Sequence, residues 1–134
     1  MKIMLTNIEI SGRPVQVRCT SAALMAIQKR SNPIWVEMEL FFSCLIRKRV
    51  LFHDHEMPTG AHEVMPGLYI SFRPVVTKVC HSKDLESWPP PLEDLSIVNV
   101  KPYVPKWLTI DFRRAQWLGE FGYTLRKGGI TTLR

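Results

Sequence analysis

The sequence predicts an α+β domain in which a mainly antiparallel sheet packs on one long buried helix (about 33–49) and one short helix (about 22–30). Two observations favour this class. A dense apolar run lies between Asn32 and Phe52, and several short segments near both ends alternate apolar and polar residues. With 134 residues, of which 46% are hydrophobic and 22% charged, the chain has the size and composition of one globular domain over 1–134.

The long helix is predicted from its capping signals and its apolar face. Asn32 is a good N-cap, and Pro33 suits the first helical position, where a missing N–H costs nothing. Acidic Glu37 and Glu39 near the start and basic residues 47–49 at the end complement a helix dipole. At 3.6 residues per turn, one broad face collects the large apolar side chains of Ile34, Trp35, Met38, Phe41, Phe42, Leu45 and Ile46.

The residues before this run predict a β-hairpin followed by the short helix. Residues 8–10 and 15–19 alternate apolar and polar side chains, and Ser11-Gly12 between them is a turn signal. Thr20 or Ser21 then caps the short helix, whose Leu24 and Ile27 face inward.

Sheet segments dominate the rest of the chain. Residues 53–63 are polar and contain Pro58 and Gly60, which predicts a surface loop. Arg73-Pro74 separates two of the later strands, and Gly119 and Gly122 mark bulges or close approaches of the backbone. A mobile tail begins at about residue 126. The strands are expected at 67–72, 75–80, 96–100, 108–112 and 117–125, with an irregular proline-rich connector over 82–96.

The cysteines and the N-terminus predict a cytoplasmic protein. Cys19, Cys44 and Cys80 are odd in number, widely spaced and set among apolar residues. That pattern is typical of buried free thiols in a reducing compartment rather than of a disulfide framework. The first residues lack a small-residue cleavage site, and no apolar run is long enough to span a membrane.

The net charge of +6 is unevenly distributed. Residues 1–52 carry eight Lys/Arg and three Asp/Glu, residues 53–94 carry three and seven, and residues 95–134 carry seven and two. A basic surface of this size permits binding of nucleic acid or of an acidic protein.

A group of imidazole, thiol and carboxylate side chains suggests a metal hypothesis. Such donors suit zinc, and two histidines separated by one residue on an extended segment point to the same side. The spacing matches no standard zinc motif, so a solvated loop is the competing interpretation. The candidate ligands are His53, His55, His62, Cys80 and His81.

A second hypothesis concerns binding through arginine, lysine and tryptophan. Basic residues beside exposed aromatic rings provide phosphate contact and base stacking, and they also occur in protein–protein hot spots. The candidate residues are Arg47, Lys48, Arg49, Trp107, Arg113, Arg114, Trp117, Arg126 and Lys127.

We therefore expect a small non-enzymatic protein that binds a nucleic acid or a nucleoprotein partner through its basic surface. The sequence contains no phosphate-binding glycine loop and no nucleophile motif, and no residue is predicted to be catalytic. One alternative is a protein-interaction subunit or inhibitor that recognises an acidic protein without touching nucleic acid. A second alternative is a metal-dependent enzyme built on the histidines, with zinc as its cofactor. No membrane partner is expected.

Overall fold

The computed structural model describes residues 3–42, 46–55, 60–76 and 100–124. Eight strands, one α-helix and one short 3₁₀ helix occur in these ranges. In chain order they are β1 (Ile3–Ile10), β2 (Arg13–Thr20), α1 (Ser21–Gln28), β3 (Ile34–Phe42), β4 (Ile46–His53), β5 (His62–Met65), β6 (Leu68–Val76), η1 (Lys101–Tyr103), β7 (Trp107–Arg113) and β8 (Gln116–Gly122).

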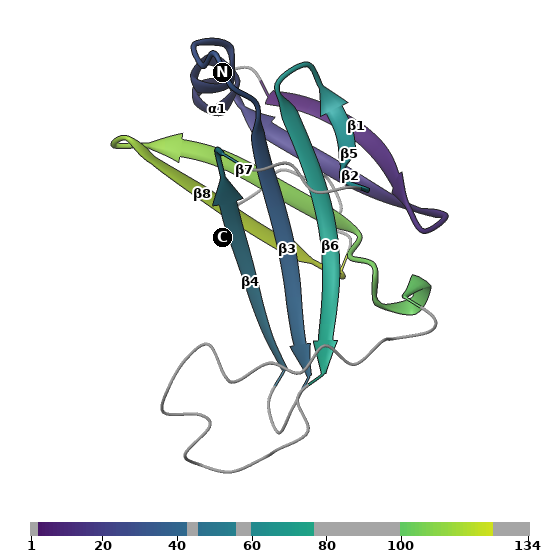
Figure 1. Cartoon of the computed structure of the whole chain (residues 1–134). Coiled ribbons are helices and arrows are strands. Elements are labelled where there is room, and N and C mark those ends of the chain that lie inside the picture. The colour runs from purple at the N-terminus through teal and green to yellow at the C-terminus, as the bar shows by residue number, and fades with distance from the viewer. Residues whose placement is uncertain (1–2, 43–45, 56–59, 77–99, 125–134) are drawn as a thin grey trace, which may run out of the picture.

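The strands form two four-stranded sheets, each built from two antiparallel hairpins. One sheet has the order β1-β2-β7-β8, and its hairpins join through the parallel pair β2 and β7. The other has the order β4-β3-β6-β5, and its hairpins join through the parallel pair β3 and β6. In Figure 1, β4, β3 and β6 run side by side in front, and the strands of the first sheet cross behind them. The fold is therefore a two-layer β structure.

The core lies between the two sheets, and α1 closes one end of it (Figure 1). Thr20 caps α1, because its hydroxyl accepts a hydrogen bond from the backbone N–H of Ala23 at 3.2 Å. The helix buries Ala23 and Ile27. Alternating strand residues fill the rest of the core, among them Val15, Val17, Cys19, Val36, Met38, Leu40, Ile70, Leu108, Ile110 and Phe121.

The prediction of an α+β fold with a long central helix is wrong. Residues 34–42 form β3 and residues 46–53 form β4, which pair as antiparallel strands. Val36, Met38 and Leu40 face the core, while Glu37 and Glu39 alternate with them on the other face. Because both faces of β3 are buried, its sequence is apolar almost throughout and the two-residue period is masked.

Other local predictions are confirmed. The hairpin is β1 and β2, with Ser11 and Gly12 at positive φ in its turn, and the short helix is α1. Strands β7 and β8 occupy the two segments predicted near the C-terminus. Within the described ranges, no helix has the length and hydropathy needed to cross a membrane.

The predicted break at Arg73-Pro74 is wrong, since β6 continues through it to Val76. Pro74 pairs with Leu40 of β3, whereas β5 pairs only with the first residues of β6, Leu68 to Ile70. The other side of Pro74 therefore borders an edge on which no described strand pairs, and a missing N–H costs little there.

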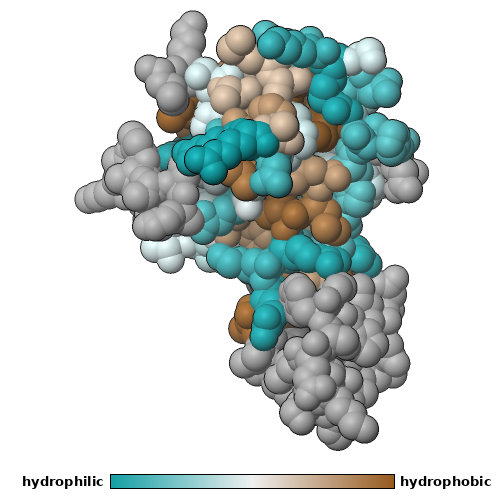
Figure 2. Space-filling model, turned by 90° about the vertical axis from the view of Figure 1, so that its left-hand side faces the viewer, coloured by the Kyte–Doolittle hydropathy of each residue, from teal (hydrophilic) through white to brown (hydrophobic). Residues whose placement is uncertain are grey.

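The edge strands β4 and β8 of the two sheets approach each other along one side of the molecule. Gly119 makes this possible, because an added Cβ would lie 2.7 Å from Val50 and 3.0 Å from Phe52. The prediction of a close approach at Gly119 is thus confirmed. Figure 2 shows this side, where hydrophobic surface is bordered by hydrophilic side chains.

Candidate functional site

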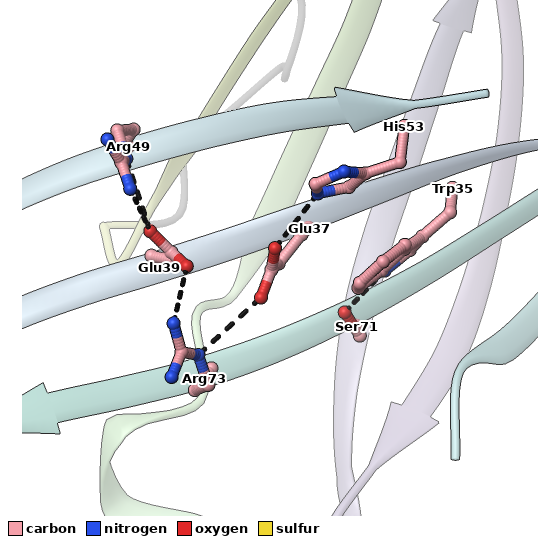
Figure 3. Close-up of polar contacts among 7 residues, drawn as sticks. All are labelled: Trp35, Glu37, Glu39, Arg49, His53, Ser71 and Arg73. Carbon is pink, nitrogen blue, oxygen red and sulfur yellow. Dashed lines mark hydrogen bonds and ion pairs between the residues drawn. The ribbon is translucent and has the colours of Figure 1, made fainter. Parts of the chain in front are cut away.

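The outer face of β3 carries a layer of linked charges, which we call the ionic layer (Glu37, Glu39, Arg49, His53 and Arg73). Figure 3 shows these side chains on three adjacent strands. Glu39 accepts hydrogen bonds from Arg49 of β4 and from Arg73 of β6, each at 2.9 Å. Glu37 lies 3.0 Å from His53 Nε2 and 3.5 Å from Arg73 Nε. The layer therefore ties β3 to both of its neighbours.

Aromatic rings lie at both ends of the ionic layer. Trp35 stacks on His53 with ring centroids 4.1 Å apart, and its indole N–H donates to Ser71 Oγ at 2.7 Å (Figure 3). At the other end, the guanidinium of Arg49 lies over the Phe41 ring, 5.4 Å from its centroid. Only 2% of the Glu39 side chain is exposed, whereas its partners Arg49 and Arg73 are 25% and 40% exposed, so a buried carboxylate is paired with partly exposed cations.

The two glutamates respond differently to this environment. Burial raises the pKa of Glu37 above its ordinary value of 4.5, and the hydrogen bond with His53 only partly offsets the effect. For Glu39, burial also acts to raise the pKa, but the hydrogen bonds from Arg73 and Arg49 outweigh it and lower the pKa. Both carboxylates contact guanidinium groups here, which favours a structural role over binding of an external anion.

The basic run Arg47, Lys48 and Arg49 lies on edge strand β4, and its side chains are divided between the two faces. Arg49 belongs to the ionic layer. Lys48 donates to the backbone carbonyl of Phe121 at 2.9 Å and lies 5.7 Å from the centroid of that ring. The predicted helix-dipole role of this run is wrong. A basic edge strand with a lysine bound to the neighbouring sheet discourages pairing with other chains.

The described histidines of the metal hypothesis do not lie together in one site. His53 contacts Glu37, whereas His55 pairs with Asp54 at 3.0 Å and is 85% exposed. His62 lies on β5. Among the residues that the structure describes, no group of three or more His, Cys, Asp or Glu is arranged to hold a metal ion. Cys80 and His81 lie outside the described residues, so the zinc hypothesis stays a prediction.

The candidates near the β7–β8 turn have different surroundings. Trp117 packs between Phe52 and Phe112, with centroid distances of 5.7 and 4.6 Å, and serves the hydrophobic core. Arg113 pairs with Asp111 at 2.9 Å, and Arg114 occupies the turn at φ 52°. Both arginines are exposed, which agrees with their position at a surface turn. Arg126 and Lys127 lie outside the described residues.

A second group of basic and aromatic residues, which we call the basic end (Arg13, Lys101, Tyr103, Lys106 and Trp107), gathers at the opposite end of β7. A Cβ added to Gly12 in the β1–β2 turn would lie 3.9 Å from Lys101 Nζ, and Arg13 is the residue after this glycine. The backbone carbonyl of Lys106 accepts a hydrogen bond from the N–H of Gln16 on β2 at 2.9 Å. In Figure 1, η1 lies beside this end of the first sheet.

The segment that forms the basic end is anchored to β8. Tyr123 donates its hydroxyl to the backbone carbonyl of Tyr103 at 2.7 Å, and burial raises the pKa of Tyr123 to about 12. The backbone N–H of Lys106 donates to the carbonyl of Gly122 at 2.8 Å. Tyr123 therefore stays protonated and holds η1 in place over a wide pH range.

Sequence reasoning identified only Trp107 from the basic end. The missed signal is the run KPYVPKW over 101–107, in which lysines alternate with aromatic residues and two prolines restrict the backbone. Arg13 has no local signal, because the parallel pairing of β2 with β7 brings it to this place.

The chain matches no protein-family model, no curated protein and no solved structure. A functional proposal for it therefore depends on the chemistry of its own residues.

Proposed function

We propose that this protein is a non-enzymatic binding protein that contacts nucleic acid, alone or within a nucleoprotein partner, through the basic end. The main support is the difference between exposed basic and exposed acidic residues. Among the described residues, eight Lys/Arg are exposed and only three Asp/Glu are. The basic ones are Arg13, Lys29, Arg47, Lys48, Lys101, Lys106, Arg113 and Arg114, and the acidic ones are Glu9, Asp54 and Glu63.

The excess of five positive charges comes from the composition of the described ranges, because folding leaves equal numbers of acidic residues (Glu37, Glu39, Asp111 and Glu120) and basic residues (Arg18, Arg30, Arg49 and Arg73) unexposed. Glu37 and Glu39 are buried in the ionic layer, and Asp111 is held by Thr20 at 2.7 Å and by Arg113. Of the three exposed acids, Asp54 pairs with His55. A surface with excess positive charge attracts polyanions over distances of about 10 Å at moderate salt.

The basic end is the part of this surface with the equipment for nucleic acid. The side chains of Arg13, Lys101 and Lys106 suit contacts with phosphate groups, which supply most of the sequence-independent affinity for nucleic acid. Tyr103 and Trp107 add aromatic rings beside them, and the ionic layer offers no comparable set. We place this activity in the cytoplasm, because a reducing compartment suits the buried thiol of Cys19, whose pKa burial raises to about 12.

The test is the salt dependence of binding to a fluorescently labelled oligonucleotide of mixed sequence. If Arg13 and Lys106 each contact one phosphate, R13A/K106A should weaken binding and reduce the slope of log K against log salt by about 1.4 units for a single strand. K29A/R30A is the matched control, since it also removes one lysine and one arginine, beyond the end of α1. We expect the slope of this control to equal that of the wild type.

Two further results would change the proposal. If R113A/R114A reduces the slope and R13A/K106A does not, the turn predicted from sequence is the interface. If the wild type binds no oligonucleotide at physiological salt, nucleic acid is not its partner.

A protein partner is the second candidate function, and one observation favours it. Edge strand β1 pairs only with β2 among the described strands, and it exposes Ile3 and Leu5 at 40% and 55%. Its described residues include no lysine or arginine, in contrast to β4. Such an edge can accept a strand from another protein. Leu5→Lys should then abolish capture of that partner without affecting oligonucleotide binding.

Nothing in the described residues supports a metal-dependent enzyme, which we do not propose.

A further inference from the structure

Trp107 is held on the outer face of its sheet against a glycine of the neighbouring strand. Trp107 of β7 pairs with Gly122 of β8, and an added Cβ on Gly122 would lie 2.3, 2.7 and 3.0 Å from three atoms of the indole. Any side chain at this position would displace the ring. The glycine therefore allows the indole to lie down on the backbone of β8.

A hydrogen bond fixes the orientation of the same ring. The indole N–H of Trp107 donates to the backbone carbonyl of Thr124 at 2.9 Å. Trp107 nevertheless remains partly exposed to solvent, unlike Leu108 and Ile110 on the inner face of the same strand. An aromatic ring fixed before the ligand arrives loses little conformational entropy on binding.

An amide and a cation of β2 share the outer face of the sheet with the indole. Gln16 of β2 lies beside Trp107 in the sheet register, and its side-chain oxygen accepts from Arg18 Nε at 3.4 Å. Lys106 precedes the tryptophan and is exposed. A fixed aromatic face beside an amide and a cation, with a second exposed cation one residue before it in the chain, matches a nucleobase stacked on the ring with its phosphates on the cations.

We propose that Trp107 is a stacking platform for an unpaired base, so that the basic end takes single-stranded nucleic acid in preference to duplex. This inference rests on the proposed function. In a duplex, both faces of every base except those of the two terminal pairs are occupied by neighbouring bases, so the indole has no internal base face to contact. Duplex binding would then involve only the phosphate contacts of the basic residues.

The experiment measures affinities for a labelled single-stranded 12-mer of thymidines and for a 12-base-pair duplex, using the wild type, W107A and W107F. W107A should weaken single-strand binding roughly 10- to 100-fold, the usual effect of removing one stacking ring. Its duplex affinity and its salt slope should stay at the wild-type values. W107F keeps a ring on Gly122 and should retain most of the affinity.

A second measurement, of tryptophan fluorescence, does not depend on comparing affinities. Stacking of a base on Trp107 should quench part of the tryptophan fluorescence of the wild type at saturating single strand, and W107F should lack that part. Thermal melting of each variant shows whether it is folded under the binding conditions.

The outcomes separate the two proposals. If W107A binds the single strand as well as the wild type does, or if the duplex binds as tightly as the single strand, the stacking inference is wrong and the proposed function stands. If neither oligonucleotide binds the wild type, the proposed function is itself wrong.

Discussion

Two basic segments of this protein look alike in the sequence and differ in the structure. Residues 47–49 and the segment 101–107 each combine positive charge with nearby aromatic rings. In the first, Arg49 is paired with Glu39 and Lys48 with the carbonyl of Phe121. In the second, the lysines are exposed beside Tyr103 and Trp107, and no described acidic residue forms an ion pair with Lys106.

The difference shows that a run of basic residues on a strand is divided by the strand itself. Successive side chains of β4 point to opposite faces, so Arg49 reaches one surface and Lys48 the other. In the segment 101–107, a 3₁₀ turn and two prolines interrupt the strand geometry and leave both lysines at one end of the sheet. We therefore infer a structural role for the first segment, and our proposal places binding at the second.

The largest effect is expected in the ionic layer. Glu39→Gln removes the negative charge between two guanidinium groups and should lower the free energy of unfolding by about 3 kcal/mol, because it leaves partly buried charges without their partner. Urea denaturation measures this change. Glu63→Gln, at an exposed position of β5, is the matched control and should stay within about 0.5 kcal/mol of the wild type. A Glu39→Gln protein as stable as the control would show that the layer does not stabilise the fold.

A smaller effect separates the two glutamates by pH. The lowered pKa of Glu39 gives stability that is present above its ordinary pKa of 4.5 and is lost as pH falls through the folded-state pKa. The raised pKa of Glu37 acts in the opposite sense: its contribution is full below 4.5 and is lost as pH rises through the folded-state pKa.

Melting temperatures between pH 2.5 and 7 therefore distinguish the two residues. Glu39→Gln should flatten the loss of stability on the acid side of pH 4.5, and Glu37→Gln should flatten a loss on the alkaline side of that pH. Equal changes of the same sign in both variants would contradict these assignments.

The parts of the fold that depend on short-range signals were predictable from the sequence. The β1–β2 turn and the cap of α1 at Thr20 follow from residues near one another in the chain. A glycine within a strand pattern marked the close approach at Gly119, although its neighbours Val50 and Phe52 are distant in the sequence. Apolar content alone could not distinguish β3 from a buried helix, because both faces of this strand are buried. Glu37 and Glu39, two residues apart, were the one local sign of a strand.

Most of the candidate site required long-range pairing. The contact of Arg73 with Glu39 joins β6 to β3, and the approach of Lys101 to Gly12, the residue before Arg13, brings η1 to the β1–β2 turn. Neither follows from periodicity or from turn residues. The alternation of lysine with aromatic residues between Lys101 and Trp107 was readable from the sequence and pointed to the same surface.

The most direct test of this comparison measures stability and oligonucleotide affinity on the same two variants, R49A and R13A/K106A. R49A should lower the free energy of unfolding by about 2 kcal/mol, because it removes one of the two guanidinium groups that pair with the buried carboxylate of Glu39. It should leave the oligonucleotide affinity of the folded protein within about twofold of the wild-type affinity. R13A/K106A should do the reverse: stability within about 0.5 kcal/mol of the wild type, and a salt slope lower by about 1.4 units. If R49A instead weakens binding without loss of stability, and R13A/K106A binds as the wild type does, the two segments have the opposite roles and the basic end is not the interface.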